Sequence, residues 1–218
     1  MTGSFAGSQV SLEAMFRHTV WMPALVLASG SPRRRDYFDQ LGLIYTVRVP
    51  NVDESVRLGE QPEMYVDRVA RRKAQAVDAA PAEVVVAADT TVALDSAILG
   101  KPVDNGAARR MLRSLSGRTH RVHTAVAVSV LGKITSEIVT TKVTFVELTD
   151  ADIDWYLATG EHSDKAGAYG IQGIGGTFVE SIDGSHSNVA GLPIAQTVAM
   201  LRKLGIDLLN SEAAKVSL

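Results

Sequence analysis

The chain has 218 residues, of which 46% are apolar, and its formal net charge is −2. This length is enough for one large domain or two small ones, and the charge favours neither nucleic acid nor a membrane surface as a partner. There is no cysteine, which excludes disulfides, thiolate catalysis and cysteine-based zinc sites and is compatible with a reducing cytoplasm. No apolar run reaches the length of a membrane span, so we expect a cytoplasmic protein.

The first elements surround a short polar segment. Residues 1–22 are weakly patterned and match no secretory signal, so we expect a flexible N-terminal extension. The apolar run at 25–28 predicts a buried strand that stops at Ser29. Ser31 then stands at a helix N-cap and Pro32 at the first helical position, and the predicted helix 33–41 ends before Gly42.

Three arginines occupy the first turn of that helix, where the helix dipole is already positive. Arg33, Arg34 and Arg35 are each disfavoured there by roughly 0.3–1 kcal/mol, and a bound anion would remove the penalty. Free N–H groups and guanidinium groups together predict a phosphate or carboxylate site. The alternative is a surface helix with solvated arginines, and this segment alone leaves both interpretations open.

The next segment brings carboxylates and a lysine. An alternating strand at 45–49 leads into a loop with Asp53 and Glu54, and a long helix is predicted over 62–77. Lys73 falls within the apolar stripe of that helix. Its ammonium group either extends to the edge of the stripe or points into a cleft, and both remain open here.

An uninterrupted apolar run at 84–88 is typical of a central strand buried on both faces. Asp89 and Thr90 follow it. A carboxylate at the carboxyl end of a buried strand lies where open α/β sheets bind their ligands, although an aspartate that starts a turn is the alternative. A buried aspartate needs a partner, a cation or a metal, and Lys101 lies on the next turn.

The rest of the chain predicts an α/β fold with a mixed sheet. We expect helices at 105–115, 150–158 and 193–204, two long β-rich runs at 119–131 and 133–148, a glycine-dense loop at 164–176 and a strand at 177–182. His120 and His123 lie three apart on a strand and form a poor metal pair. His162 and His186 fall in predicted loops, and we expect both in solvated or turn positions.

The candidate residues favour chemistry on a phosphate. Carboxylates at Asp53, Glu54 and Asp89, without cysteine or a histidine pair, favour Mg²⁺ or Mn²⁺ shared with a phosphate group. Lys73 and Lys101 would stabilise charge in phosphoryl or nucleotidyl transfer. The chain has no P-loop motif, and its glycines do not follow the order of a dinucleotide-binding fingerprint.

A family resemblance covers residues 23–204. Its segments are Ser29-Gly-Ser-Pro-Arg-Arg34, Asp53-Glu54, Lys73-Ala74, Ala88-Asp-Thr90, Gly100-Lys-Pro102, Leu115-Ser-Gly117, the run from Asp164 to Gly173 and Asn188-Val-Ala-Gly-Leu-Pro193. In this order they resemble the Maf proteins, a family of nucleoside triphosphate pyrophosphatases. The resemblance implies an elongated mixed α/β sheet with flanking helices, two lobes and a central cleft, related to inosine triphosphate pyrophosphatases. It also implies a single catalytic domain over 23–207 with a tail at 208–218, and often a homodimer.

The resemblance also implies roles for individual residues. A divalent cation, Mg²⁺ or Mn²⁺, would assist hydrolysis of a nucleoside triphosphate to the monophosphate and pyrophosphate. In the implied site Asp89 is the proton acceptor, and the other residues in the catalytic cleft are Glu54, Lys73 and Lys101. The metal ligands are Glu54 and Asp89, and the triphosphate is surrounded by Ser29, Ser31, Arg33 and Arg34. Substrate choice involves Arg33, Thr90 and Gln172. Whether Asp89 is base, metal ligand or both stays open.

The branch of the family follows from two positions. Asp89-Thr90 and the run ending in Gln172 resemble the branch that acts on dTTP and UTP, whereas the 7-methyl-GTP branch typically has Asp-Gln and a glutamate in place of Gln172. The amide of Gln172 is able to donate to O4 of uracil or thymine and to accept from N3–H. We therefore expect a dTTP/UTP pyrophosphatase. The alternatives are an enzyme for modified pyrimidine nucleotides and a non-enzymatic, nucleotide-binding regulator of septum formation or cell division.

Overall fold

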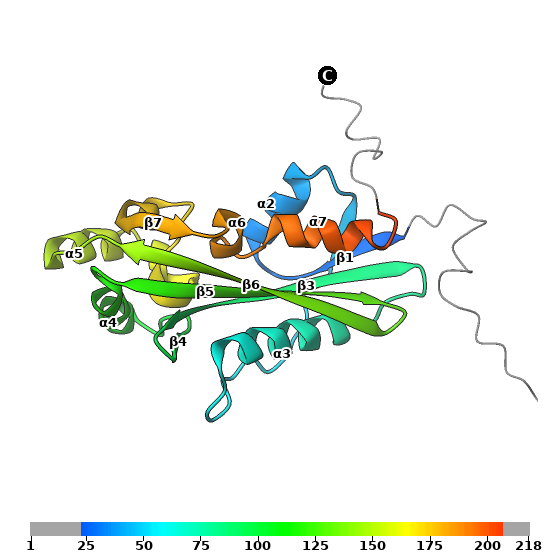
Figure 1. Cartoon of the computed structure of the whole chain (residues 1–218), viewed down its shortest axis with the longest axis horizontal. Helices are drawn as coiled ribbons and strands as arrows, with labels where there is room; N and C mark the ends of the chain where they lie inside the picture. The colour runs from blue at the N-terminus through cyan, green and yellow to red at the C-terminus, as the bar shows by residue number, and fades with distance from the viewer. Residues whose placement is uncertain (1–22, 207–218) are drawn as a thin grey trace, which may run out of the picture.

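The computed structural model describes residues 23–206, so the predicted extension at 1–22 and the tail at 208–218 lie outside the described residues. A seven-stranded mixed sheet runs along the long axis (Figure 1). Its strands are β1 (Ala24–Ala28), β2 (Tyr45–Val47), β3 (Glu83–Leu94), β4 (Ala97–Leu99), β5 (Thr119–Val130), β6 (Lys133–Phe145) and β7 (Val179–Asp183).

Helices cover both faces of this sheet. In Figure 1, α2 (Pro32–Gln40) and α7 (Ile194–Arg202) lie above it, and α3 (Pro62–Gln75) lies below. At the left end lie α4 (Asn105–Leu115) and α5 (Asp150–Ala158), and the short α6 (His186–Val189) lies near the middle, between β7 and α7. Three 3₁₀ helices, η1 (Glu161–Asp164), η2 (Ala166–Ala168) and η3 (Ile174–Phe178), form the glycine-rich segment.

The sheet has a gap in its middle. Strand order is β2-β1-β3-β5-β6-β7, with β1 parallel to both of its neighbours and the other pairs antiparallel. On one edge of β3, pairing with β1 ends at Ala87, and pairing with β4 begins only at Val92. Residues 88–91 therefore have no strand neighbour on that edge, where a ligand is able to approach the backbone and side chains of β3.

Successive side chains of β3 point to opposite faces of the sheet, one covered by α3 and the other by α2 and α7. Val85 and Ala87 pack in the cluster that contains Val66 and Ala70 of α3, whereas Val86 and Ala88 pack with residues of α2 and α7. Because side chains alternate along a strand, Asp89 faces α3 and Thr90 faces α2. This alternation positions the two residues for different partners.

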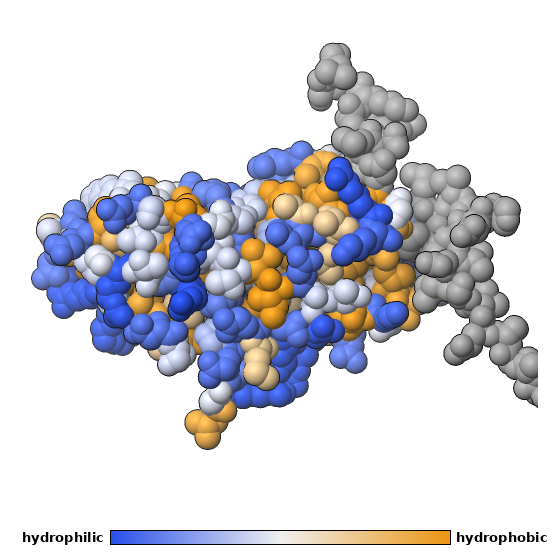
Figure 2. Space-filling model, in the orientation of Figure 1, coloured by the Kyte–Doolittle hydropathy of each residue, from blue (hydrophilic) through white to orange (hydrophobic). Residues whose placement is uncertain are grey.

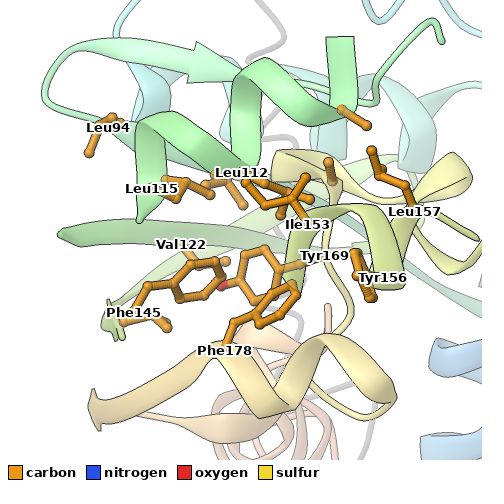
Figure 3. Packing of buried hydrophobic residues seen from close by; sticks show 14 residues of the cluster. Leu94, Leu112, Leu115, Val122, Phe145, Ile153, Tyr156, Leu157, Tyr169 and Phe178 are labelled. Carbon is orange, nitrogen blue, oxygen red and sulfur yellow. The ribbon is translucent and has the colours of Figure 1, made fainter. Parts of the chain in front are cut away.

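A third hydrophobic cluster fills the lobe at the α4–α5 end. Leu112 and Leu115 of α4 contact Ile153 and Tyr156 of α5 over the rings of Phe145, Tyr169 and Phe178 (Figure 3). The rings of Phe145 and Tyr169 meet edge to face, with centroids 4.7 Å apart, a preferred aromatic geometry. The cluster anchors the glycine-rich segment through Tyr169 and Phe178.

Hydrophilic residues cover much of the face in Figure 2, and hydrophobic atoms mark the tip of the loop before α3. Within the described range, no helix is long and apolar enough to cross a membrane. The prediction of a mixed α/β fold is confirmed.

Several element predictions need correction. The strand expected over 84–88 continues to Leu94, because antiparallel pairing with β5 and β4 extends it past the polar residues. β4 and α6 were not predicted, and part of the strand expected at 177–182 is η3. His162 is buried, only 4% exposed, and its Nε2 bonds Asn105. Of the two expected positions, solvated or turn, the solvated one is wrong, and His162 lies in the 3₁₀ helix η1.

Candidate active site

A cleft of about 950 Å³ opens beside the gap in the sheet. Its size falls within the range that holds a small organic ligand. The walls come from the β1–α2 turn, the loop before α3, β3 and the glycine-rich segment. All ten predicted site residues line it: Ser29, Ser31, Arg33, Arg34, Glu54, Lys73, Asp89, Thr90, Lys101 and Gln172. Asp53 does not, because it lies on the outer side, 3.9 Å from Arg72.

A lysine and two carboxylates meet on the α3 side of the cleft. The Lys73 Nζ lies 2.8 Å from Asp89 Oδ1 and 2.9 Å from Glu54 Oε2. Lys73 and Asp89 are only 9% and 5% exposed, whereas half of the Glu54 side chain is exposed. The ammonium group therefore points into the cleft.

The environment of Asp89 changes its acidity. Burial raises the pKa of Asp89 above its ordinary value, and this effect outweighs the opposing influence of Lys73 and Arg34. Its second oxygen, Oδ2, is buried without a hydrogen-bond partner in the described part of the chain. A buried carboxylate with a raised pKa and a free oxygen beside a cleft is typical of a functional group rather than a structural one.

The loop that carries Glu54 is held from α3. Tyr65 donates its hydroxyl to the Glu54 carbonyl at 3.1 Å, and Arg68 donates to the Ser55 carbonyl at 2.9 Å. Arg68 also forms a two-point ion pair with Glu60 at the end of the loop. These contacts position Glu54 over the cleft without involving its side chain.

Arg34 organises the opposite wall. Its guanidinium group is buried and donates to the Gly191 carbonyl at 2.8 Å, to Ser29 Oγ at 3.2 Å and to Thr90 Oγ1 at 3.2 Å. Thr90 in turn bonds Thr124 at 2.9 Å. Burial lowers the pKa of Arg34, and the nearby Asp89 opposes this effect. Arg34 therefore joins α2, β3 and the segment before α7.

The start of α2 leaves polar groups free for a ligand. Ser31 is the N-cap residue and Pro32 follows it, as predicted, but the Ser31 hydroxyl makes no capping bond. The backbone N–H of Ser31 instead donates to Ser29 Oγ. The Arg33 guanidinium lies 3.6 Å from the Asp164 carboxylate across the mouth of the cleft, and Arg35 is exposed. Lys101 is exposed at the rim.

Gln172 lies on the glycine-rich segment, across the cleft from Lys73. Its side-chain Nε2 donates to the hydroxyl of the buried Tyr37 on α2 at 3.2 Å. The NH₂ group of this exposed amide is thus bonded to Tyr37, and its oxygen is free to accept a hydrogen bond. Gly167 of this segment has a φ of 70°, and its backbone donates to Gly100, which ties the segment to the turn with Lys101.

The family follows from a sequence comparison. The sequence model described as Maf-like protein matches residues 24–204. The chain belongs to the Maf family.

Similar Maf proteins cover nearly the same range. The dTTP/UTP pyrophosphatase of Anaeromyxobacter dehalogenans (strain 2CP-1) is 56% identical over 190 residues, which make up 85% of this chain and 96% of that protein. That of Shewanella oneidensis is 49% identical over 191 residues, covering 84% and 98%. Among solved structures, a HAM1 protein from Coxiella burnetii aligns with 17% identity and a TM-score of 0.49, over 84% of this chain and 100% of that one.

The structure adds site residues of this Maf protein that sequence reasoning missed. Tyr37 contacts Gln172, and Tyr65 and Glu161 line the cleft. A tyrosine in a helix stripe is typical of a core position, so its pattern gives no signal. Glu161 stands directly before a segment rich in glycine N–H groups, which is the only sequence signal it offers.

Proposed function

We propose that this Maf protein hydrolyses dTTP and UTP to the monophosphate and pyrophosphate. The observation that carries the proposal is that one cleft holds Gln172 together with the buried Asp89–Lys73 pair and Glu54. Relatives at 49–56% identity are named dTTP/UTP pyrophosphatases, which supports the proposal.

Different residues of the cleft would bind the triphosphate and the base of the substrate. Ser29, Ser31 and Arg33 at the start of α2 would bind the triphosphate, because backbone N–H groups, the helix dipole and a guanidinium group favour anions. Lys73 and Lys101 would add positive charge. The amide of Gln172 would pair with O4 and N3–H of uracil or thymine.

In the proposed reaction, water attacks the α-phosphorus and the bond to the bridging oxygen of the β-phosphate breaks. Pyrophosphate leaves with that oxygen. Asp89 accepts the proton of the attacking water, for which its buried position and its free Oδ2 are suited. Lys73 holds the carboxylate in place through the contact at 2.8 Å.

A divalent cation would be held by Glu54 and Asp89. Their oxygens suit Mg²⁺ or Mn²⁺. The free Asp89 Oδ2 is available as a metal ligand or as the proton acceptor, and these two roles compete for the same atom. The described residues contain no cluster of three histidines or carboxylates that would hold a metal without substrate. The remaining ligands would therefore come from phosphate and water, and the cation would neutralise phosphate charge. Homodimer formation and a cytoplasmic location stay predictions.

Pyrophosphate release from UTP and dTTP, with Mg²⁺ or Mn²⁺ and with EDTA, tests the proposal. We expect release only with metal, and a loss of at least a hundredfold in kcat for Asp89→Asn, within the range of general-base contributions of about 10²–10⁴. Asp53→Asn, which changes a carboxylate outside the cleft, is the matched control and is expected to keep wild-type activity. Full turnover by Asp89→Asn would contradict the mechanism.

A further inference from the structure

Gln172 stands on a tight turn with little internal support. The backbone N–H of Gly173 donates to the carbonyl of Gly170 at 3.2 Å, so residues 170–173 form a β-turn with Gln172 at its third position. One backbone bond does not hold such a turn rigidly when both of its ends are glycine. The position of the Gln172 amide therefore depends on what holds the two ends of the turn, together with the bond from its Nε2 to the Tyr37 hydroxyl.

The Glu161 carboxylate holds the end that follows Gln172. Its Oε2 accepts from the N–H of Ile174 at 2.8 Å, and its Oε1 accepts from the N–H of Gly175 at 3.0 Å. Burial raises the pKa of Glu161, but the N–H groups of Gly175 and Ile174 and the Tyr156 hydroxyl lower it more, so its pKa lies below the ordinary value. The carboxylate therefore remains ionised near neutral pH and keeps both acceptors.

Tyr156 holds the other end of the turn. Its hydroxyl donates to Glu161 Oε1 at 3.0 Å and accepts from the N–H of Gly170 at 3.3 Å. Tyr156 is fully buried on α5 and packs against Phe178 in the aromatic cluster (Figure 3). Both ends of the turn are thus connected through Glu161 and Tyr156 to the core of the lobe.

The glycines at the ends of the turn follow from this arrangement. A Cβ at Gly173 would overlap the Glu161 carboxylate, and one at Gly170 would lie 2.6 Å from Lys165 Cε and 3.0 Å from Glu161 Oε1. The carboxylate thus occupies the space that a side chain at Gly173 would need, and Lys165 and Glu161 together occupy that space at Gly170. The turn is packed on Glu161 as well as hydrogen-bonded to it.

We infer that Glu161 is a positioning residue for base selection: it fixes the turn that carries Gln172 and so sets which pyrimidine the amide accepts. The inference rests on the proposed function, because it assigns the base to Gln172. Uracil presents an acceptor at O4 and a donor at N3, whereas cytosine presents a donor at N4 and an acceptor at N3. A Gln172 amide held in one position favours one of these patterns, and a mobile one discriminates less.

The test compares Glu161→Gln with Asp152→Asn in the full-length enzyme. Glu161→Gln keeps the size of the side chain but places an NH₂ group against backbone donors. Asp152→Asn makes the same chemical change at the capping box of α5, where the carboxylate accepts from the N–H of Thr149 away from the turn. Both are measured for kcat and KM with UTP and CTP, alone and in a Gln172→Ala background.

We expect Glu161→Gln to lower the UTP-to-CTP ratio of kcat/KM about tenfold, mainly through the KM for UTP. Asp152→Asn is expected to leave the ratio unchanged. Because Glu161 acts through Gln172, the Glu161→Gln change is expected to have no further effect on the ratio once Gln172→Ala is present. An unchanged ratio in Glu161→Gln, or an equal further drop in the double variant, would overturn the inference.

Amide hydrogen exchange separates this inference from the proposed function. Exchange at Ile174 and Gly175 is expected to be at least tenfold faster in Glu161→Gln than in the wild type, whether or not UTP is a substrate. Unchanged exchange would overturn the positioning role. A wild-type protein that releases no pyrophosphate from UTP would instead contradict the proposed function.

Discussion

Replacing Lys73 by methionine isolates the charge at the centre of the cleft. Methionine keeps most of the buried chain length and removes only the ammonium group, which lies 2.8 Å from Asp89 and 2.9 Å from Glu54. Glu54 is half exposed and recovers solvation, so its lost contact has little cost. Asp89 is buried, and breaking a buried pair by removing one partner costs about 3–5 kcal/mol.

Protonation of Asp89 limits that cost. Taking up a proton at pH 7 against an ordinary pKa of 3.8 costs about 4 kcal/mol, at 1.36 kcal/mol per pH unit. The expected loss for Lys73→Met is therefore about 3–4 kcal/mol at pH 7. In the folded variant Asp89 would then carry a proton, which the unfolded chain releases above pH 4. The loss of unfolding free energy therefore becomes smaller as the pH falls, and it is below about 2 kcal/mol at pH 5.

Urea unfolding of the wild type and Lys73→Met at pH 5, 6 and 7 measures this difference. Lys133→Met, at an exposed turn between β5 and β6, is the matched control and is expected within about 0.5 kcal/mol of the wild type at every pH. Adding Asp89→Asn to Lys73→Met is expected to restore most of the stability at pH 7, because an asparagine is neutral without taking up a proton. A Lys73→Met variant as stable as the wild type, without pH dependence, would refute the reasoning.

Three further changes test other parts of the account. Gln172→Glu is expected to lower kcat/KM for UTP at least tenfold, because a carboxylate cannot donate to O4; an unchanged base preference would contradict this. Arg34→Lys removes the guanidinium group that bonds acceptors on three segments at once, and it is expected to cost about 2–3 kcal/mol in urea unfolding, whereas no loss would contradict the joining role. Burial lowers the pKa of His120 to about 4, so the unfolded chain binds a proton first as the pH falls from 6.5 to 4. Over this pH range the wild type is expected to lose about 3 kcal/mol of unfolding free energy through His120, and His120→Gln is expected to lose about 3 kcal/mol less. Equal slopes of unfolding free energy against pH in the two proteins would contradict this prediction.

Local sequence signals and the family resemblance together predicted ten of the residues that line the cleft. Buried strands, helix caps and the lysine within an apolar stripe follow from spacing over a few residues, and Lys73 does point into the cleft. Asp89 was expected at a strand end for a reason that proved only partly right. β3 continues past Asp89, and the strand that ends beside it is β1. Where a neighbouring strand ends depends on how the strands pair, which cannot be predicted from the sequence of one segment.

The contacts that sequence reasoning missed are long-range. Tyr37 meets Gln172 across 135 positions of sequence, and Arg34 reaches Gly191 across 157. The bond between buried His162 and Asn105 spans 57 positions. Hydrophobic periodicity shows which face of an element is buried, but it does not show which polar groups will meet there. Glu161 was missed for the same reason, since its partners become visible only once the glycine-rich segment is folded.

The central claim is that the cleft binds a pyrimidine triphosphate through Gln172 and cleaves it to pyrophosphate. The most direct measurement is kcat/KM for pyrophosphate release across UTP, dTTP, CTP, 5-methyl-UTP, pseudo-UTP and 7-methyl-GTP under one set of metal conditions. The account predicts the highest values for nucleotides that present O4 and N3–H, with UTP and dTTP at least tenfold above CTP and 7-methyl-GTP. Equal values for all six, or release of orthophosphate instead of pyrophosphate, would contradict it.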